Sequence, residues 1–416
     1  MREVLEQVAA NLTRNKLRSF LTMAGIAWGV ASIVLIVAMG DGFKLGQKKN
    51  LKQLGENIVI VFGGRTEKQA GGQRAGRRVF LNYRDLRDIR EECFLVKRAA
   101  PELESNARAI SRFNSGSFTV QGVEPVFAEL RTVVIDGGRF LADADERDAR
   151  RVCILGNNVR KQLFASRPGV LGSEIRLNGY PYTVVGLMPD KQQNSSYNGR
   201  DIDKIFIPYS SMTRDLPPKA STYIDGVLSD IVYAPASLDD WKGAQKQVRR
   251  VLARNHGYSP DDLAAIRMWD TVEGAELTDR IFTSMTAFLG TIALVTLTLG
   301  GVGVLNIMLV SVTERTREIG LRKALGARRI HILRDFMVEG LVLTLASGLV
   351  GWLGSWGLAS VVNSFPMPEM FGGLPVTGKT TGWAFGALAV IAIVSALWPA
   401  WKAASLTPVE ALRYER

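Results

Sequence analysis

The chain has 416 residues, of which 47% are apolar, and a net charge of +12. This length allows two or three domains, and such a charge in a soluble protein would suggest a nucleic-acid partner. The basic residues instead cluster beside long apolar stretches, so membrane topology accounts for them and no nucleic-acid partner is expected. Four stretches contain no charged residue: Ser19–Gly40, Ile281–Thr313, Gly340–Pro368 and Thr380–Trp401. Each reaches the roughly 20 helical residues that cross a bilayer core about 30 Å thick.

The sequence therefore predicts a membrane protein with four transmembrane α-helices and a large α/β extracytoplasmic domain between helices 1 and 2. The expected segments are an amphipathic N-terminal helix (1–19), transmembrane helix 1 (20–40), the extracytoplasmic domain (41–280), transmembrane helix 2 (281–312), a cytoplasmic segment (313–335), transmembrane helix 3 (336–362), an external loop (363–381), transmembrane helix 4 (382–401) and a cytoplasmic tail (402–416).

The first stretch has a second interpretation, as a cleaved signal peptide. It follows Arg14, Lys16 and Arg18, and it ends in the small-residue pattern Ala38-Met39-Gly40. Its apolar run of about 20 residues exceeds the 7–15 typical of a signal peptide, so we favour a retained span.

The inserted domain reads as α/β. Strands are predicted at Asn57–Phe62, Ser117–Gln121, Val152–Leu155, Glu174–Leu177, Tyr182–Val185 and Lys204–Ile207, and helices at Tyr83–Lys97 and Asp239–His256. Gly63–Arg78 and Gln192–Arg200 read as loops. Breaks near Ser115 and Pro217-Pro218 suggest one subdomain inserted within another.

The two cysteines of the chain, Cys93 and Cys153, both fall in this domain. They could pair in an oxidising compartment, but two separate buried thiols are the simpler interpretation. With His256 and His331 they form no metal-ligand spacing, so no metal site is predicted.

The loop charges predict the orientation. Thr313–Asp335 holds seven basic residues, whereas Asn363–Thr381 holds only Lys379. Basic residues accumulate in short cytoplasmic loops, so both termini are expected in the cytoplasm and the inserted domain outside.

The external loop contains a sequence that imitates a phosphate-binding loop. Gly373–Thr380 satisfies G-x-x-x-x-G-K-[ST], but Pro366 and Pro368 precede it and a membrane span follows it. A phosphate-binding loop needs a buried strand before it and a soluble helix after it. We therefore expect an external turn, with Lys379 at the level of the lipid headgroups.

The uncharged spans argue against a proton-coupled transporter and against a channel lined by charged rings. No Gly-x-Ser-x-Gly nucleophile elbow is present, so the chain is not predicted to be an enzyme. Glycines recur in the spans: Gly25 and Gly29 form a G-x-x-x-G pair, and Gly348, Gly351, Gly354 and Gly357 recur every third residue. Such glycines let helices approach closely, either within one chain or between two copies.

The segment between the second and third spans combines charge pairs with an apolar side. Glu318 and Arg322 are i,i+4 partners, and Gly326 interrupts the pattern, so two short amphipathic helices joined near Gly326-Ala327 are predicted. The segment either lies on anionic lipid or docks a cytoplasmic partner.

Three long motifs resemble those of MacB-type and FtsX-like permeases of ABC transporters. They are Asn15–Val30, Glu314–Arg328 with Phe336, Glu339 and Gly340 downstream, and Pro399–Arg413. The resemblance covers both ends of the chain, and the inserted domain only in size and position.

The resemblance implies a non-catalytic permease subunit in the bacterial inner membrane, paired with a second copy or a related permease. A separate cytoplasmic ATPase would bind ATP and Mg, because only 19 residues precede the first span. The implied coupling segment is Arg315–Arg329, with Arg315, Glu318, Gly320, Arg322, Gly326, Ala327 and Arg328 as its coupling residues. The N-terminal stretch Leu5–Arg18 would lie along the membrane beside it.

The implied mechanism is mechanotransmission, in which ATPase closure moves the extracytoplasmic domain for efflux, export or lipoprotein release. A periplasmic adaptor or outer-membrane component would fit such a system. The alternative is a cell-division type of transducer that activates an external cell-wall hydrolase.

Overall fold

The computed structural model describes residues 16–55, 57–70, 72–165, 167–190, 197–218, 224–237, 239–368 and 371–412. The chain divides into two compact units, Lys48–Leu277 and the combination of Met1–Gln47 with Thr278–Arg416. The expected N-terminal helix, 1–19, lies almost wholly outside the described residues.

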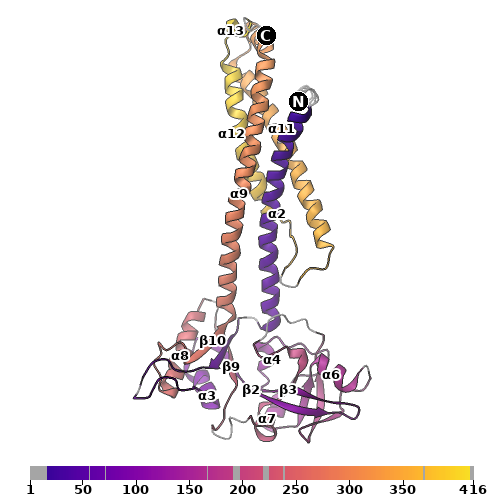
Figure 1. The fold of residues 1–416 in the computed structure, drawn as a ribbon, viewed down its shortest axis with the longest axis vertical. Coiled ribbons are helices and arrows are strands. Elements are labelled where there is room, and N and C mark those ends of the chain that lie inside the picture. The colour runs from indigo at the N-terminus through magenta and orange to yellow at the C-terminus, as the bar shows by residue number, and fades with distance from the viewer. Residues whose placement is uncertain are drawn as a thin grey trace. The chain divides into compact units, whose positions relative to one another are not determined.

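Four helices of the second unit are long and apolar enough to cross a membrane. They are α2 (Lys16–Leu54), α9 (Thr271–Glu314), α11 (Arg329–Asn363) and α12 (Gly378–Ser405) (Figure 1). The short α10 (Thr316–Ala324) lies between α9 and α11, and α13 (Pro408–Leu412) follows α12. Both α2 and α9 are longer than their charge-free stretches. The apolar run marks the length that lipid requires, whereas backbone hydrogen bonding continues through the flanking helix-forming residues.

The external loop that imitates a phosphate-binding motif has no strand before it among the described residues, since 366–368 and 371–377 are irregular. Thr377 caps α12, and its side chain accepts a hydrogen bond from the Thr380 amide at 3.3 Å. The amide of Gly372 donates to the carbonyl of Gly42 on α2, at 2.8 Å. The motif is thus a turn that packs on the first membrane helix.

Unit Lys48–Leu277 is built on one sheet, with the strand order β10-β1-β9-β2-β3-β8-β5-β7-β4 and with β6 pairing β2 and β7. The strands are β1 (Val59–Gly63), β2 (Val96–Ile110), β3 (Ser115–Val123), β4 (Gly137–Gly138), β5 (Val152–Leu155), β6 (Glu174–Leu177), β7 (Tyr180–Leu187), β8 (Lys204–Pro208), β9 (Asp230–Pro235) and β10 (Ile266–Asp270). Strands from within residues 115–208 form one end of the order, so the segment between the two predicted breaks adds its strands to a shared sheet.

Alternation along the strands gives the sheet two apolar faces. On β1, Val59 and Val61 belong to one buried cluster, and Ile60 belongs to the other. Helices α3 (Tyr83–Glu92), α6 (Asn157–Phe164), α7 (Tyr209–Asp215) and α8 (Trp241–His256) bury side chains in the first cluster, and α4 (Phe127–Leu130) does so in the second. The short α5 (Asp143–Arg147) and a 3-10 turn at Asp201–Asp203 complete the unit.

One sequence expectation was wrong in this unit. The helix predicted at Tyr83–Lys97 ends at Glu92, where the Cys93 amide donates to the Ile89 carbonyl, and the long strand β2 begins at Val96. The favoured interpretation of the two cysteines is confirmed, because both are separate buried thiols. Of the two predicted loops, Gly63–Arg78 carries an isolated bridge between Arg65 and Arg78, and part of Gln192–Arg200 lies outside the described residues.

Candidate functional site

The predicted coupling segment forms one short helix, α10, between two membrane helices. It follows α9 after a break at Arg315, whose carbonyl accepts a hydrogen bond from the Ile319 amide at 3.0 Å. The hydroxyl of Thr316 bonds the carbonyls of Val312 and Thr313, both at 3.0 Å, which holds the start of α10 against the end of α9. The second expected short helix is the first part of α11, because no break separates it from the span.

The outward face of α10 combines charge with exposed apolar side chains. Arg322 Nη2 lies 2.6 Å from Glu318 Oε1, as the i,i+4 spacing predicts. Leu321 and Leu325 are 55% and 81% exposed beside this pair. Lone exposed leucines are ordinary, but here two of them, one on α10 and one directly after it, lie beside a charge pair.

The inward face of α10 is buried. Ile319 is 3% exposed and belongs to the apolar cluster shared by the membrane helices. Gly320 is also buried, and a Cβ built there would lie 2.5 Å from Ala411 Cβ on α13. Of the predicted coupling residues, Gly320 is therefore a packing position and does not face solvent.

Arg315 is tied to the third membrane helix. Its Nη1 lies 3.3 Å from Oε2 of Glu339, a carboxylate that is 8% exposed within α11. Loss of this ion pair would strongly destabilise the fold, because the charge of a buried carboxylate would be less well compensated. The pair therefore holds the junction of α9 and α10 against α11.

The turn after α10 needs its glycine. Gly326 has φ +96°, a conformation that residues with a Cβ rarely adopt, and its amide bonds the Lys323 carbonyl at 3.0 Å. Arg328 then caps α11 in an extended conformation, while Ala327 packs against the membrane cluster. Glu318, Arg322, Gly326 and Arg328 are the predicted coupling residues that remain exposed.

The predicted packing glycines separate into two groups. A Cβ at Gly29 would lie 2.8 Å from Leu297 Cα on α9, and one at Gly25 would lie 3.7 Å from Gly300 Cα. On α11, a Cβ added at Gly348 would lie 2.2 Å from Leu388 Cδ2 of α12. A Cβ added at Gly351 would lie 2.2 Å from the Ala27 carbonyl oxygen of α2. A Cβ at Gly354 would meet no atom within 4 Å. Gly25, Gly29, Gly348 and Gly351 thus pack within one chain.

The sheet of the other unit carries a buried polar network on the same face as α4. Glu102 of β2 is fully buried and accepts hydrogen bonds from Gln121 at 2.6 Å, from Asn198 at 3.2 Å and from the Tyr197 hydroxyl. Lys204 Nζ donates to Gln121 Oε1 at 3.2 Å and to Asn198 Oδ1 at 2.5 Å.

A buried ion pair and two facing carboxylates complete this network. Arg131 Nη2 lies 3.1 Å from Asp201 Oδ1, and both side chains are 2% exposed. Asp230 of β9 stands directly opposite Glu102 in the β2–β9 ladder. Burial, and then the facing Glu102 and nearby Glu104, raise the pKa of Asp230 to about 8. Burial likewise raises the pKa of Glu102 and lowers that of Lys204.

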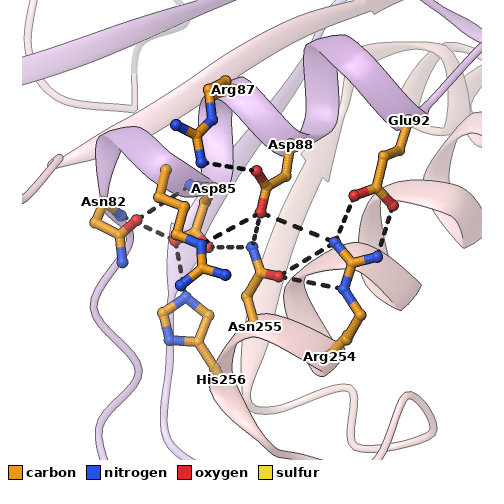
Figure 2. Close-up of polar contacts among 9 residues, drawn as sticks. Asn82, Asp85, Arg87, Asp88, Glu92, Arg254, Asn255 and His256 are labelled. Atoms are coloured by element: carbon orange, nitrogen blue, oxygen red, sulfur yellow. Dashed lines mark hydrogen bonds and ion pairs between the residues drawn. The ribbon is translucent and has the colours of Figure 1, made fainter.

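A second polar cluster joins α3 to the end of α8 (Figure 2). His256 Nε2 lies 2.8 Å from Asp85 Oδ2, and Asn255 Nδ2 donates to Asp85 Oδ1 at 3.0 Å. Arg254 donates hydrogen bonds from both terminal guanidinium nitrogens to the two carboxylate oxygens of Glu92, at 2.6 and 2.7 Å. Asp85 also belongs to the capping box of α3, so its carboxylate is fully engaged and the cluster attaches one helix to another.

Sequence reasoning missed three groups at the coupling segment: Lys323, Glu339 as the partner of Arg315, and Ala411. Lys323 was counted only as one basic residue of the loop. The available signal was the run of small residues before and within α13, which allows close packing, but sequence alone does not say what packs there.

Comparisons with known proteins identify the family of the chain. The MacB-like periplasmic core domain matches residues 19–251, and the FtsX-like permease C-terminal domain matches residues 290–408. A Bacillus subtilis protein named uncharacterized ABC transporter permease YknZ is 31% identical over 99% of both chains. A Chlorobium luteolum protein named macrolide export ATP-binding/permease protein MacB is 33% identical over 99% of this chain and 60% of its own length.

The chain therefore spans about three fifths of the length of the MacB relatives that it matches. The periplasmic region of MacB from Actinobacillus actinomycetemcomitans superposes with a TM-score of 0.43 at 17% identity, over 56% of this chain and 96% of that chain. With two domain families matched in sequence and a full-length relative aligned, the chain belongs to the MacB-like, FtsX-like family of ABC transporter permeases.

Proposed function

We propose that the chain is the permease subunit of an ABC exporter and transmits motion from a cytoplasmic ATPase to its extracytoplasmic domain. The observation that carries this proposal is the two-sided α10. Its inner face is held by the membrane helices, and its outer face presents Glu318, Arg322 and Leu325 to a partner. The relatives named as macrolide export proteins support export as the process.

The proposed orientation places α10 and both termini in the cytoplasm. It rests on the seven basic residues of Thr313–Asp335 against the single Lys379 of Asn363–Thr381. The bound ATP and Mg would belong to the ATPase, and a second permease copy would complete the transporter.

The helices that flank the domain are built to move together. α2 and α9 each continue without a break beyond their apolar stretches. Phe43 stacks on Phe282 with ring centroids 4.8 Å apart, and Lys44 Nζ lies 2.9 Å from Asp279 Oδ1. Phe371 of the external loop also contacts Phe43, with ring centroids 4.9 Å apart. These contacts support a transmission role, because they hold α2 and α9 together at residues 43–44 and 279–282, so that a movement of one helix would be passed to the other.

Copurification tests the proposal. Purification of the tagged permease from membranes should also recover an ATPase that has a phosphate-binding loop. The permease should change the rate at which this ATPase hydrolyses ATP. Leu325→Glu should reduce the recovered ATPase at least about tenfold, because it places a charge on the proposed docking face, and the loss of an interface hot spot costs roughly 2 kcal/mol or more. Glu318→Arg should act in the same direction by breaking its pair with Arg322.

The matched control is Leu263→Glu, the same substitution at a leucine that is 64% exposed in unit Lys48–Leu277. It should leave the recovered ATPase unchanged. If Leu325→Glu and Leu263→Glu behaved alike, α10 would not be the docking element and the proposed function would lose its support.

A further inference from the structure

The inner face of α10 is joined to the C-terminal end of the chain at two points. The first is steric. At Gly320 of α10, an added Cβ would lie 2.5 Å from Ala411 Cβ of α13, but 3.5 Å from Ala411 Cα and carbonyl carbon. Ala411 itself is fully buried. The clash therefore comes from a single methyl group on the partner helix.

The second point is a hydrogen-bonded cation. Lys323 Nζ donates to the carbonyl oxygens of Ala404 and Leu406, each at 2.5 Å. These carbonyls lie where α12 ends, so they are acceptors that the helix cannot satisfy with its own amides. A lysine is favourable at such a helix C-terminus, where the partial charge of the backbone is negative.

The chain after α12 is shaped to return against α10. Thr407 precedes Pro408, an order that favours the start of a helix, and the Ala411 amide bonds the Thr407 carbonyl at 3.0 Å. The resulting α13 is only one turn long and is too short to be stable alone. Its packing on α10 is what orders it.

We infer that Gly320 and Lys323 are positioning residues that latch α10 to the end of α12, with Ala403–Leu412 as the receiving segment. The latch makes the C-terminal segment a second attachment of α10, in addition to its covalent links to α9 and α11. A displacement of α10 by a partner would then reach α12 directly. This inference rests on the proposed function for the role of α10, but the latch itself exists independently of any partner.

The geometry predicts a compensating pair of substitutions. Gly320→Ala should force α10 and α13 apart, although alanine is otherwise the better helix former. Ala411→Gly removes the opposing methyl group and leaves the new Cβ at ordinary contact distance. Gly354→Ala is the matched control, because a Cβ there meets no atom within 4 Å.

The experiment is amide hydrogen exchange of the full-length permease in lipid nanodiscs, followed in peptides covering 316–324 and 408–412. Gly320→Ala should speed exchange in both peptides roughly tenfold, because overpacking destabilises the contact between α10 and α13. Adding Ala411→Gly should restore rates to within about twofold of wild type, and Gly354→Ala should leave both peptides unchanged. Lys323→Met should speed exchange, and Lys323→Arg, which keeps a cationic donor, should speed it less.

Recovery of the copurified ATPase supplies the second measurement. Gly320→Ala should lower it, and Ala411→Gly in the same chain should restore it. Unchanged exchange in Gly320→Ala, or no rescue by Ala411→Gly, would overturn the latch. Faster exchange with full ATPase recovery would overturn its positioning role. The proposed function fails by a different result, namely ATPase recovery that Leu325→Glu does not change.

Discussion

At the scale of single residues, the least expected feature is a pair of facing carboxylates inside the sheet. Glu102 and Asp230 oppose each other across β2 and β9, and both are buried. Three hydrogen bonds and the nearby Lys204 compensate Glu102, whereas Asp230 carries a pKa raised to about 8 by burial and by the two neighbouring glutamates. When Asp230 keeps its proton at neutral pH, two negative charges do not face each other across the ladder.

This arrangement predicts a pH dependence of stability. An aspartate in the unfolded chain has a pKa of about 3.9, so folding raises the pKa of Asp230 and the folded state binds that proton more tightly. The contribution of this protonation to the free energy of unfolding is full below about pH 4 and is lost as the pH rises through about 8. Asp230→Asn keeps a neutral group at all pH values and should raise the unfolding temperature at pH 8–9.

The measurement is the midpoint of thermal unfolding of the full chain in detergent, taken from pH 5 to pH 9. Asp239→Asn, at an exposed position of the same unit, is the control and should reproduce the wild-type profile. A wild-type midpoint that stays level across this range, or an Asp230→Asn profile that falls as steeply as wild type, would contradict the assignment.

At the scale of elements, the glycines of α11 distinguish packing within the chain from packing between chains. Gly351 lies against the backbone of Ala27, where a Cβ would come within 2.2 Å of an oxygen, whereas Gly354 faces open space. Gly351→Ala should destabilise the helix bundle by about 1–3 kcal/mol because backbone atoms cannot move aside as side chains do.

Gly354→Ala provides the comparison, on the same helix and three residues away. It should leave the unfolding temperature of the monomer in detergent unchanged, while Gly351→Ala lowers it. If Gly354→Ala instead shifts the chain from dimer to monomer on cross-linking in membranes, its face contacts a second copy. Equal effects of the two substitutions on the monomer would mean that the helices pack differently.

The elements also show what sequence patterns could and could not predict. The four spans were predictable because lipid tolerates few charges over about 20 residues. Strand β2 was missed because Val96–Ile110 is rich in alanine, glutamate and arginine and contains Pro101, a composition that does not favour a strand. Its conformation comes from pairing with β9 and β3 on either side, which is tertiary information.

The coupling segment shows the same division within one helix. The Glu318 and Arg322 pair follows from local spacing, and the structure forms it. Gly320 and Lys323 look equally local in the sequence, yet their contacts are with residues about 80 to 90 positions away on α12 and α13. Local periodicity predicts which residues share a face, but not which distant segment covers that face.

At the scale of the whole molecule, the proposed direction of transmission depends on which end of the membrane helices faces the cytoplasm. The proposal places α10 and its basic loop inside and unit Lys48–Leu277 outside. The two native thiols are suited to a test, because Cys93 and Cys153 are 2% and 0% exposed. Burial raises the pKa of both thiols, which keeps them in the unreactive protonated form.

A single exposed cysteine on each unit would therefore report the orientation against a low background. With a membrane-impermeant maleimide, Ser237→Cys should be labelled in intact cells after the outer barrier is opened. Ala324→Cys, exposed on α10, should be labelled only once the inner membrane is permeabilised. The reverse pattern would place α10 outside, away from ATP. A cytoplasmic ATPase could not then dock there, and the seven basic residues of its loop would need an explanation other than topology.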